Sequence, residues 1–242
     1  MEQDFSHRLQ AIRAAFAADP HNEALRGALQ DYFDELRVCA QEALRPQVGK
    51  LTREALSLLR KFRNAQPPTR AEADAVMDLS ALCEDLAFAC DLLCDGQNRR
   101  IYCTDMQTVF AVCRPRAVLW AALNLLTNAV QYAEGRYIFI GTSETERFVQ
   151  LSVTCEGDFP IAAFQSGLVR AGSGLWYAEK TARLHGGKLL LAQAHTQNTV
   201  ALSLPRTAYL CQNIAETDFT DWLADSLSPV YTAFCEICTP RL

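Results

Sequence analysis

The sequence predicts an α+β protein: an N-terminal helical hairpin or bundle region followed by an α/β sandwich, with a mixed sheet and helices on one of its faces. Three observations lead to this fold class. Residues 1–65 repeat apolar side chains at helical spacing and carry almost no strand signal. Residues 119–132 read as one long helix with a single apolar stripe. Alternating patterns at residues 137–141 and 148–154 predict a pair of antiparallel strands.

Helical segments follow one another through the N-terminal region. Apolar stripes run through residues 5–16, 25–39 and 51–62, each at the spacing of a buried helix face. Pro46 and Gly49 are expected to interrupt the helical pattern between the second and third stripes. Because a hairpin or a few short helices bury little apolar surface by themselves, we expect the exposed stripes to meet in a homodimer.

A linker divides the chain. The run Gln-Pro-Pro-Thr at residues 66–69 is the clearest break in the periodic patterns. It separates a helical dimerisation region, residues 1–66, from the sandwich, residues 70–205. Residues 206–242 form a C-terminal helical extension.

The elements of the sandwich can be read in order along the chain. We expect a helix at 78–94, a turn at 95–98, strands at 100–102 and 108–112, the long helix after Pro115, and a last strand at 200–204. In the extension, apolar residues at helical spacing predict a helix at 219–227 that ends near Pro229.

Composition excludes several classes of protein. Half of the 242 residues are hydrophobic, and the formal net charge is −5 without a basic run, so nucleic acid is not expected as a partner. No apolar run reaches the roughly 20 residues that cross a bilayer, and the polar N-terminus lacks a signal-peptide core, so no membrane contact is expected. The ten cysteines are scattered in apolar contexts, which is typical of thiols in a reducing cytoplasm. Cys235 and Cys238 form one CxxC pair, and zinc would need further ligands.

Asn124 and Asn128 lie four residues apart and therefore share one face of the long helix. An amide presents an uncharged carbonyl oxygen, so two amides on one face can hold a hydrated Mg²⁺ ion or hydrogen-bond a nucleotide. The alternative is an ordinary amphipathic helix with two polar surface residues.

Glycines mark both ends of a second helix. Gly172 and Gly174 precede it, and Gly186 and Gly187 end it before the strand-like residues 188–191. Glycines at a helix start let a phosphate approach the backbone N–H groups, where the helix dipole also favours an anion. A GxG pair is weak evidence by itself.

The order of these elements resembles the ATP-binding domain of sensor histidine kinases, a branch of the Bergerat-fold ATPases. Residues 124–132, NLLTNAVQY, are similar to the asparagine box of that family. The segments HGGKLLL at 185–191 and TVALSLP at 199–205 are similar to its closing elements. The resemblance covers residues 78–205, about half of the chain.

The resemblance implies a nucleotide site with ATP and Mg²⁺ as cofactors. Asn128 would hold the metal, Asn124 would stand beside it as a catalytic residue, and Tyr132 would lie against the nucleotide. The first glycine box would contribute Gly157, and the second would contribute Gly172, Gly174 and Leu175.

Several positions depart from the family pattern. Cys155 stands where the family has an aspartate that accepts from the adenine amino group, and Trp176 stands where a glycine lets the phosphates approach. Gln131 replaces a cation near the phosphates, and residues 161–171 are short for a lid. Asn124 takes the place of the glutamate base of hydrolysing relatives, which suits phosphoryl transfer better than ATP hydrolysis.

His7 is the candidate phosphoacceptor. The run Phe-Ser-His-Arg-Leu at residues 5–9 resembles the phosphohistidine motif on the first dimerisation helix of the family, with one spacer residue fewer. Arg8 replaces the acidic residue that usually helps to deprotonate the histidine. The alternative is a solvent-facing helical histidine.

These features predict a cytoplasmic histidine-kinase-like signalling protein that binds ATP–Mg²⁺ and phosphorylates a histidine, from which a response regulator takes the phosphoryl group. A second hypothesis is a non-catalytic scaffold or phosphotransferase whose degenerate site binds nucleotide weakly or not at all. A third is a partner-switching kinase of the anti-sigma type, against which the long N-terminal helices argue. The altered glycine boxes favour the second hypothesis, and the intact NLLTNA run favours the first.

Overall fold

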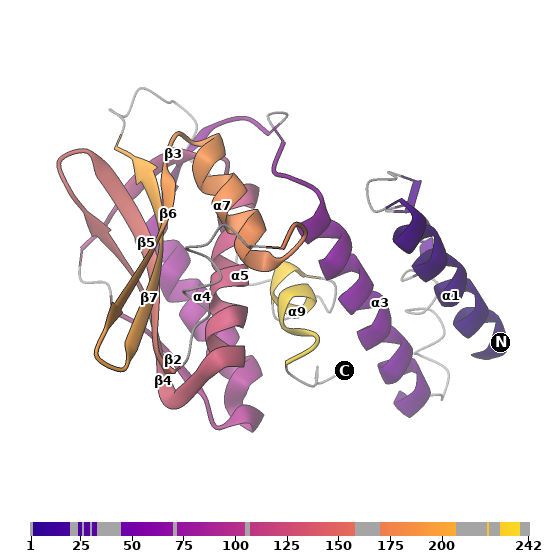
Figure 1. Cartoon of the computed structure of the whole chain (residues 1–242). Helices are drawn as coiled ribbons and strands as arrows, with labels where there is room; N and C mark the ends of the chain where they lie inside the picture. The colour runs from indigo at the N-terminus through magenta and orange to yellow at the C-terminus, as the bar shows by residue number, and fades with distance from the viewer. Residues whose placement is uncertain are drawn as a thin grey trace.

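The computed structural model of the chain describes residues 2–19, 24–25, 27–29, 31–32, 45–69, 72–104, 107–157, 170–206, 222 and 228–237. Within these residues the protein has the predicted α+β fold. Figure 1 shows the sheet at one side of the molecule and the N-terminal helices at the other, with the remaining helices between them.

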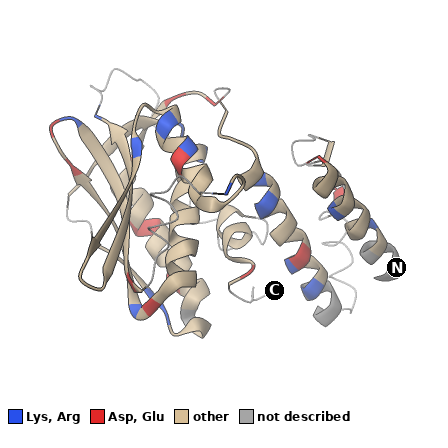
Figure 2. Ribbon diagram, in the orientation of Figure 1, with Lys and Arg blue, Asp and Glu red and all other residues tan. Residues whose placement is uncertain are grey.

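The main sheet is mixed and has five strands. In spatial order these are β2 (Arg100–Cys103), β4 (Ala133–Glu144), β5 (Phe148–Gly157), β7 (Gln197–Pro205) and β6 (Lys188–Ala194). The β2–β4 pair is parallel and the other pairs are antiparallel, which confirms the predicted hairpin of β4 and β5. Figure 2 shows few charged residues in the middle of these strands, and charges gather at the strand ends and on the helices.

A second, two-stranded sheet was not predicted. It pairs β1 (Ala75–Asp78) with β3 (Phe110–Cys113) in antiparallel register. Asp78 therefore ends a strand, and the helix expected from that residue begins at Leu79. The side chain of Asp78 caps the helix, because its Oδ1 accepts hydrogen bonds of 3.0 Å from the backbone N–H groups of Ser80 and Ala81.

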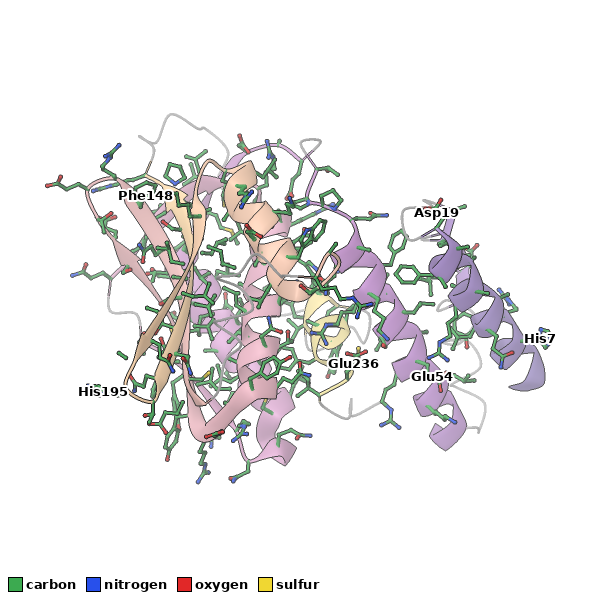
Figure 3. All side chains as sticks on the ribbon, viewed as in Figure 1. His7, Asp19, Glu54, Phe148, His195 and Glu236 are labelled. Carbon is green, nitrogen blue, oxygen red and sulfur yellow. The ribbon has the colours of Figure 1, made fainter. Side chains whose placement is uncertain are left out.

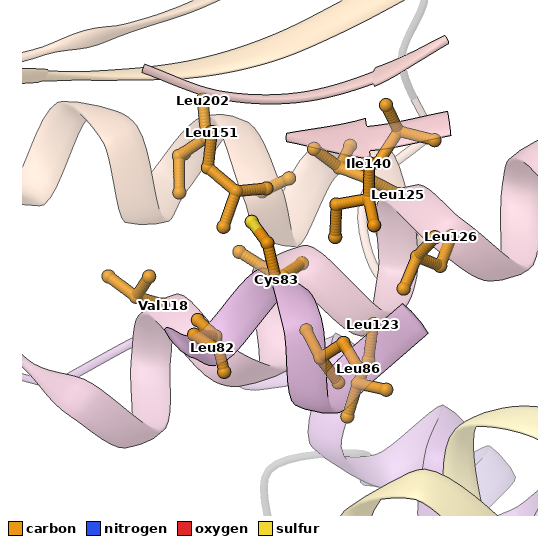
Figure 4. Packing of buried hydrophobic residues seen from close by; sticks show 14 of the residues in the cluster. Leu82, Cys83, Leu86, Val118, Leu123, Leu125, Leu126, Ile140, Leu151 and Leu202 are labelled. Atoms are coloured by element: carbon orange, nitrogen blue, oxygen red, sulfur yellow. The ribbon is translucent and has the colours of Figure 1, made fainter. Parts of the chain in front are cut away.

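Helices cover one face of the main sheet. They are α4 (Leu79–Cys94), α5 (Pro115–Tyr132) and α7 (Gly174–Leu184), and the 3₁₀ turn η1 (Asp95–Gln97) follows α4. Figure 4 shows leucines of α4 and α5 packed against Ile140, Leu151 and Leu202 of the sheet. Along β5, buried and half-buried residues alternate, as expected for a strand with one face on the core.

The N-terminal helices are α1 (Glu2–Ala18) and α3 (Arg45–Ala65). Leu9 of α1, and Leu56 and Phe62 of α3, belong to a second apolar cluster, to which Leu29 from the segment between the two helices also contributes. Gly49 does not interrupt the helix, because α3 runs through it, whereas Pro46 lies in the first turn, where α3 starts. Proline is tolerated in the first turn of a helix because its missing N–H would have no intrahelical partner there.

The short helix α9 (Pro229–Phe234) joins the two clusters. Its residues Val230, Ala233 and Phe234 are buried in the main core, and the adjacent Cys235 is buried in the N-terminal cluster. Pro229 therefore begins a helix, and Ser228 caps it by accepting from the N–H of Tyr231 at 3.3 Å. The helix expected at 219–227 lies outside the described residues, apart from the buried, helical Trp222.

The described cysteines form no disulfide, and all but the half-buried Cys103 are buried. Cys238 lies outside the described residues, which hold no group of three or more His, Cys, Asp or Glu side chains able to bind a metal. Among the described helices, none combines the length and the apolar character needed to cross a membrane.

Candidate functional site

The amide of Asn124 is engaged inside the protein. Its side chain is only 1% exposed, and its Nδ2 donates to Asn64 Oδ1 at 3.0 Å and to the carbonyl oxygen of Trp120 at 2.9 Å. Asn64 Oδ1 also accepts from Trp120 Nε1 at 2.9 Å. These bonds tie α3 to α5 on the face where a nucleotide was expected.

Gly174 packs directly against Asn124. A Cβ atom at position 174 would lie 2.5 Å from Asn124 Oδ1, so only glycine fits there. That oxygen is buried without a hydrogen-bond partner. Ser173 caps α7 by accepting from the N–H of Trp176 at 3.2 Å. The turn at residues 172–174 therefore lets the start of α7 pack closely against α5.

Asn128 differs from Asn124. It is half-buried, its Nδ2 is buried without a partner, and its side chain forms no hydrogen bond with a described residue. Because the Nδ2 atom is the enclosed one, the carbonyl oxygen is the atom that a cation could reach. An amide oxygen is a suitable ligand for Mg²⁺, and the oxygen of Asn128 is open to such a role, whereas the oxygen of Asn124 is covered by Gly174.

The next turn of α5 contacts both α3 and α9. Arg60 of α3 donates to Thr127 Oγ1 at 3.1 Å and pairs with Glu236 Oε2 at 3.2 Å. Ser57 Oγ also donates to Glu236, which lies between α9 and α3 in Figure 3. A cavity of about 360 Å³ remains beside these groups, and Gln131 is one of the residues that line it. Asn64, Arg60 and Glu236 were not predicted from the sequence. Isolated polar residues at contacts between helices leave no repeating pattern of apolar side chains that could mark them.

The first glycine box lies at the end of β5. Cys155 is 5% exposed and belongs to the main core, and burial raises the pKa of its thiol. Gly157 has a φ of +145°, and a Cβ there would lie 2.5 Å from the carbonyl oxygen of Tyr132, so glycine is required. Residues 158–169, which include most of the predicted lid, lie outside the described residues.

The remaining predicted site residues surround these. Tyr132 ends α5 and is exposed, Leu175 is half-buried against the main core, and Gly172 lies in the turn beside the end of α3 with a φ of +80°. Arg99 was not predicted, but it donates to the carbonyl oxygens that follow α5, at 2.8 Å to that of Gly135. A guanidinium at a helix C-terminus is electrostatically favourable.

The structure does not bring His7 to this region. His7 is exposed on α1 and lies at the opposite end of the molecule from the sheet (Figure 3). His185 ends α7, where its Nε2 accepts from the N–H of Arg114 at 2.9 Å and its Nδ1 lies 2.8 Å from the carbonyl oxygen of Thr181. His195 is an exposed residue of the β6–β7 turn (Figure 3).

We expect stability to fall at alkaline pH. Burial, with the carboxylates of Glu72 and Asp74, raises the pKa of the Cys113 thiol from 9.0 to about 12. The stabilisation is therefore complete below pH 9 and is lost as the pH rises toward 12, by about 1.4 kcal/mol per pH unit. Urea unfolding between pH 8 and pH 11 measures this slope. Burial also raises the pKa values of Tyr32, Tyr177 and Cys235 to about 12, so Cys113→Ala should reduce this slope without abolishing it, and an unchanged slope in that variant would contradict the assignment.

The chain resembles known proteins in fold but not in sequence. No protein-family profile matches the chain, and no curated protein is similar to it in sequence. Full-length ShkA in complex with AMPPNP aligns at 18% identity over 69% of this chain, with a TM-score of 0.50, and 38% of the ShkA chain is covered. The ATP-binding domain of PrrB from Mycobacterium tuberculosis aligns at 19% identity over 57% of this chain and 100% of its own, with a TM-score of 0.48. The histidine kinase AdeS of Acinetobacter baumannii aligns at 14% identity over 85% of this chain and 97% of its own, also with a TM-score of 0.48.

The ShkA likeness agrees with the topology already described. A mixed sheet in the order β2-β4-β5-β7-β6 carries its helices on one face. The helix α5, with the run similar to the asparagine box, contacts α7, which starts at the run similar to the second glycine box. The chain therefore has the histidine-kinase-like ATPase fold.

Proposed function

We propose that this protein is a signalling scaffold or phosphotransferase with a histidine-kinase-like fold, whose nucleotide site is degenerate and binds ATP–Mg²⁺ weakly or not at all. One observation carries the proposal: Asn124, half of the asparagine pair, is held by Asn64 of α3 and covered by Gly174 of α7. The Nδ2 donors of Asn124 are engaged and its oxygen is covered by Gly174, so the side chain would have to leave this buried position, and lose bonds that each contribute about 1 kcal/mol, to contact a nucleotide.

Two further positions support a degenerate site. Cys155 is part of the core and offers no carboxylate to an adenine amino group. Trp176, near the start of α7, stands where the family's glycine would leave room for phosphate. The centre of its ring lies 5.6 Å from the ammonium of Lys180. The loss of one charge-assisted hydrogen bond weakens affinity by roughly ten- to a hundred-fold.

A second candidate function, that of an active histidine kinase, is favoured by Asn128. Its side chain has no partner among the described residues and could hold Mg²⁺. In this candidate, His7 would accept the phosphoryl group and pass it to a response regulator. Because His7 lies far from α5 in one chain, the histidine of a second copy, in a homodimer formed through residues 1–66, would have to be the acceptor.

Nucleotide titration distinguishes the two functions. We expect calorimetry to detect no ATP binding in the submicromolar range, with or without Mg²⁺, because Asn124 and Cys155 are engaged internally. Any Mg²⁺-dependent binding that is found should vanish in Asn128→Ala and persist in Gln193→Ala, which alters an exposed amide on β6. Submicromolar binding that depends on Asn128 would reject the scaffold and support the kinase.

The homodimer is tested separately by light scattering at micromolar concentration. We expect a dimer, and a monomer with folded N-terminal helices would reject this part of the proposal. The exposed apolar stripes that predicted this dimer are not found among the described residues: the apolar stripes of α1 and α3 are buried within one chain, and the large exposed apolar side chains lie on α4, the end of α5 and the sheet. The double variant Phe88→Ser and Leu92→Ser, on α4, is the control: a dimer formed through residues 1–66 should survive it.

A further inference from the structure

The outer surface of α4 carries two large apolar side chains that remain in contact with water. Phe88 is 67% exposed and Leu92 is 52% exposed. The two residues lie four positions apart, so their side chains are neighbours on one face of the helix. Single exposed apolar residues are common on protein surfaces. An adjacent pair with more than half of its surface in water is instead a candidate contact for a partner.

Acidic side chains continue the same stripe toward the start of α4. Glu84 lies four positions before Phe88 and Asp85 lies three positions before it, so both share its face. The helix dipole does not account for these carboxylates, because its effect is confined to the first turn, which holds no acidic residue. The stripe therefore has an acidic half and an apolar half.

The two carboxylates of this stripe are not balanced by a described cation. Burial and the neighbouring charge of Glu84 raise the pKa of the Asp85 carboxyl above its usual value. Asp91, on the flank of the stripe, differs from both, because it pairs with Arg100 at 2.9 Å and accepts from the N–H of Ile101 at 2.8 Å. Among the described residues, neither Glu84 nor Asp85 belongs to an ion pair of that kind. Cations on a partner would relieve the repulsion between them.

We infer that this face of α4 docks a basic amphipathic helix of another protein. Two apolar side chains of that helix, one turn apart, would pack on Phe88 and Leu92. Lys or Arg side chains one turn further along would lie beside Glu84 and Asp85, which fixes the orientation of the helix. The same carboxylates would repel an anionic membrane. No nucleotide takes part, so the inference stands or fails separately from the proposed function.

Calorimetry with the full chain and a synthetic peptide tests the site. The probe contains only Leu and Lys, spaced so that each residue type occupies its own face of a helix. We expect saturable binding that weakens as salt is added. A peptide of the same composition in which Leu and Lys alternate should bind roughly ten-fold more weakly, because that pattern favours a strand. A helical peptide of Leu and Glu should not bind.

Substitutions on α4 locate the site. Phe88→Ser and Leu92→Ser should each weaken binding of the Leu–Lys helix by about ten-fold. Glu84→Gln should weaken it by roughly two- to five-fold, as expected for the loss of an exposed ion pair. The matched controls are Leu190→Ser on β6 and Glu146→Gln between β4 and β5, which remove an exposed apolar and an exposed acidic side chain elsewhere and should leave binding unchanged.

The backbone amide resonances of residues 84–92 give a second readout and should shift on addition of the Leu–Lys helix. Urea midpoints of the variants close to that of the wild type show that weaker binding is not loss of fold. Several results would overturn the inference: no saturable binding of the Leu–Lys helix, equal binding of the alternating peptide, or affinities unaffected by both Phe88→Ser and Leu92→Ser. Loss of a homodimer in the double variant would also overturn it, by assigning this face of α4 to a second copy of the chain.

Discussion

Replacing Phe234 with alanine is expected to lower the free energy of unfolding by about 3–5 kcal/mol, because the loss of a buried aromatic ring leaves a cavity. The side chain is 1% exposed and lies in the main core, although α9 belongs to the C-terminal extension. Urea unfolding should show a lower midpoint with an unchanged slope.

Phe88→Ala is the matched control for this variant. Phe88 lies on α4 and is 67% exposed, so its removal should change stability by no more than about 0.5 kcal/mol. Limited proteolysis gives a further readout: since α9 contacts both α3 and α5, Phe234→Ala should make the junction between the helical region and the sandwich easier to cleave. Equal stability of the two variants would show that α9 does not hold the clusters together.

Asn64→Ala is expected to cost about 2–4 kcal/mol. The change removes the oxygen that accepts from Trp120 Nε1 and Asn124 Nδ2, and each buried donor left without a partner costs roughly 1–3 kcal/mol. The measurement is again urea unfolding. Gln131→Ala, which removes an exposed amide from α5, is the control and should be nearly neutral.

A double-mutant cycle with Asn124→Ala tests the network itself. In the Asn64→Ala background one of the unpaired donors belongs to Asn124, so Asn124→Ala should cost less there than in the wild type. The expected coupling is about 0.5–3 kcal/mol, the usual range for residues in direct contact. Additive costs would mean that the two amides do not depend on each other, and the observation behind the proposed function would lose its weight.

The local elements of this protein could be predicted from the sequence. The apolar stripe of α5, the glycines at both ends of α7 and the alternation of β4 and β5 each depend on residues close together in the chain. Helix ends and strand faces follow from backbone sterics and from the periodicity of side chains, so a single sequence is enough to place them. The fold class follows from the order of those elements. The short strand β1 was missed, since four residues are too few to establish a period.

The roles of the polar side chains were decided by the tertiary structure alone. Asn124 and Asn128 have the same chemistry and belong to the same run of residues, NLLTNAVQY. Yet Asn124 is held by Asn64, whereas Asn128 has no partner among the described residues. An amide can bind a ligand or a neighbouring side chain equally well, so its function depends on which group the fold places beside it. The same holds for α9, which is buried through contacts with α3 and α5, both distant in sequence. Just after α9, Glu236 accepts from Ser57 of α3, at a separation of 179 positions. No local pattern encodes such a contact, because its energy comes from surfaces that meet only after the chain has folded.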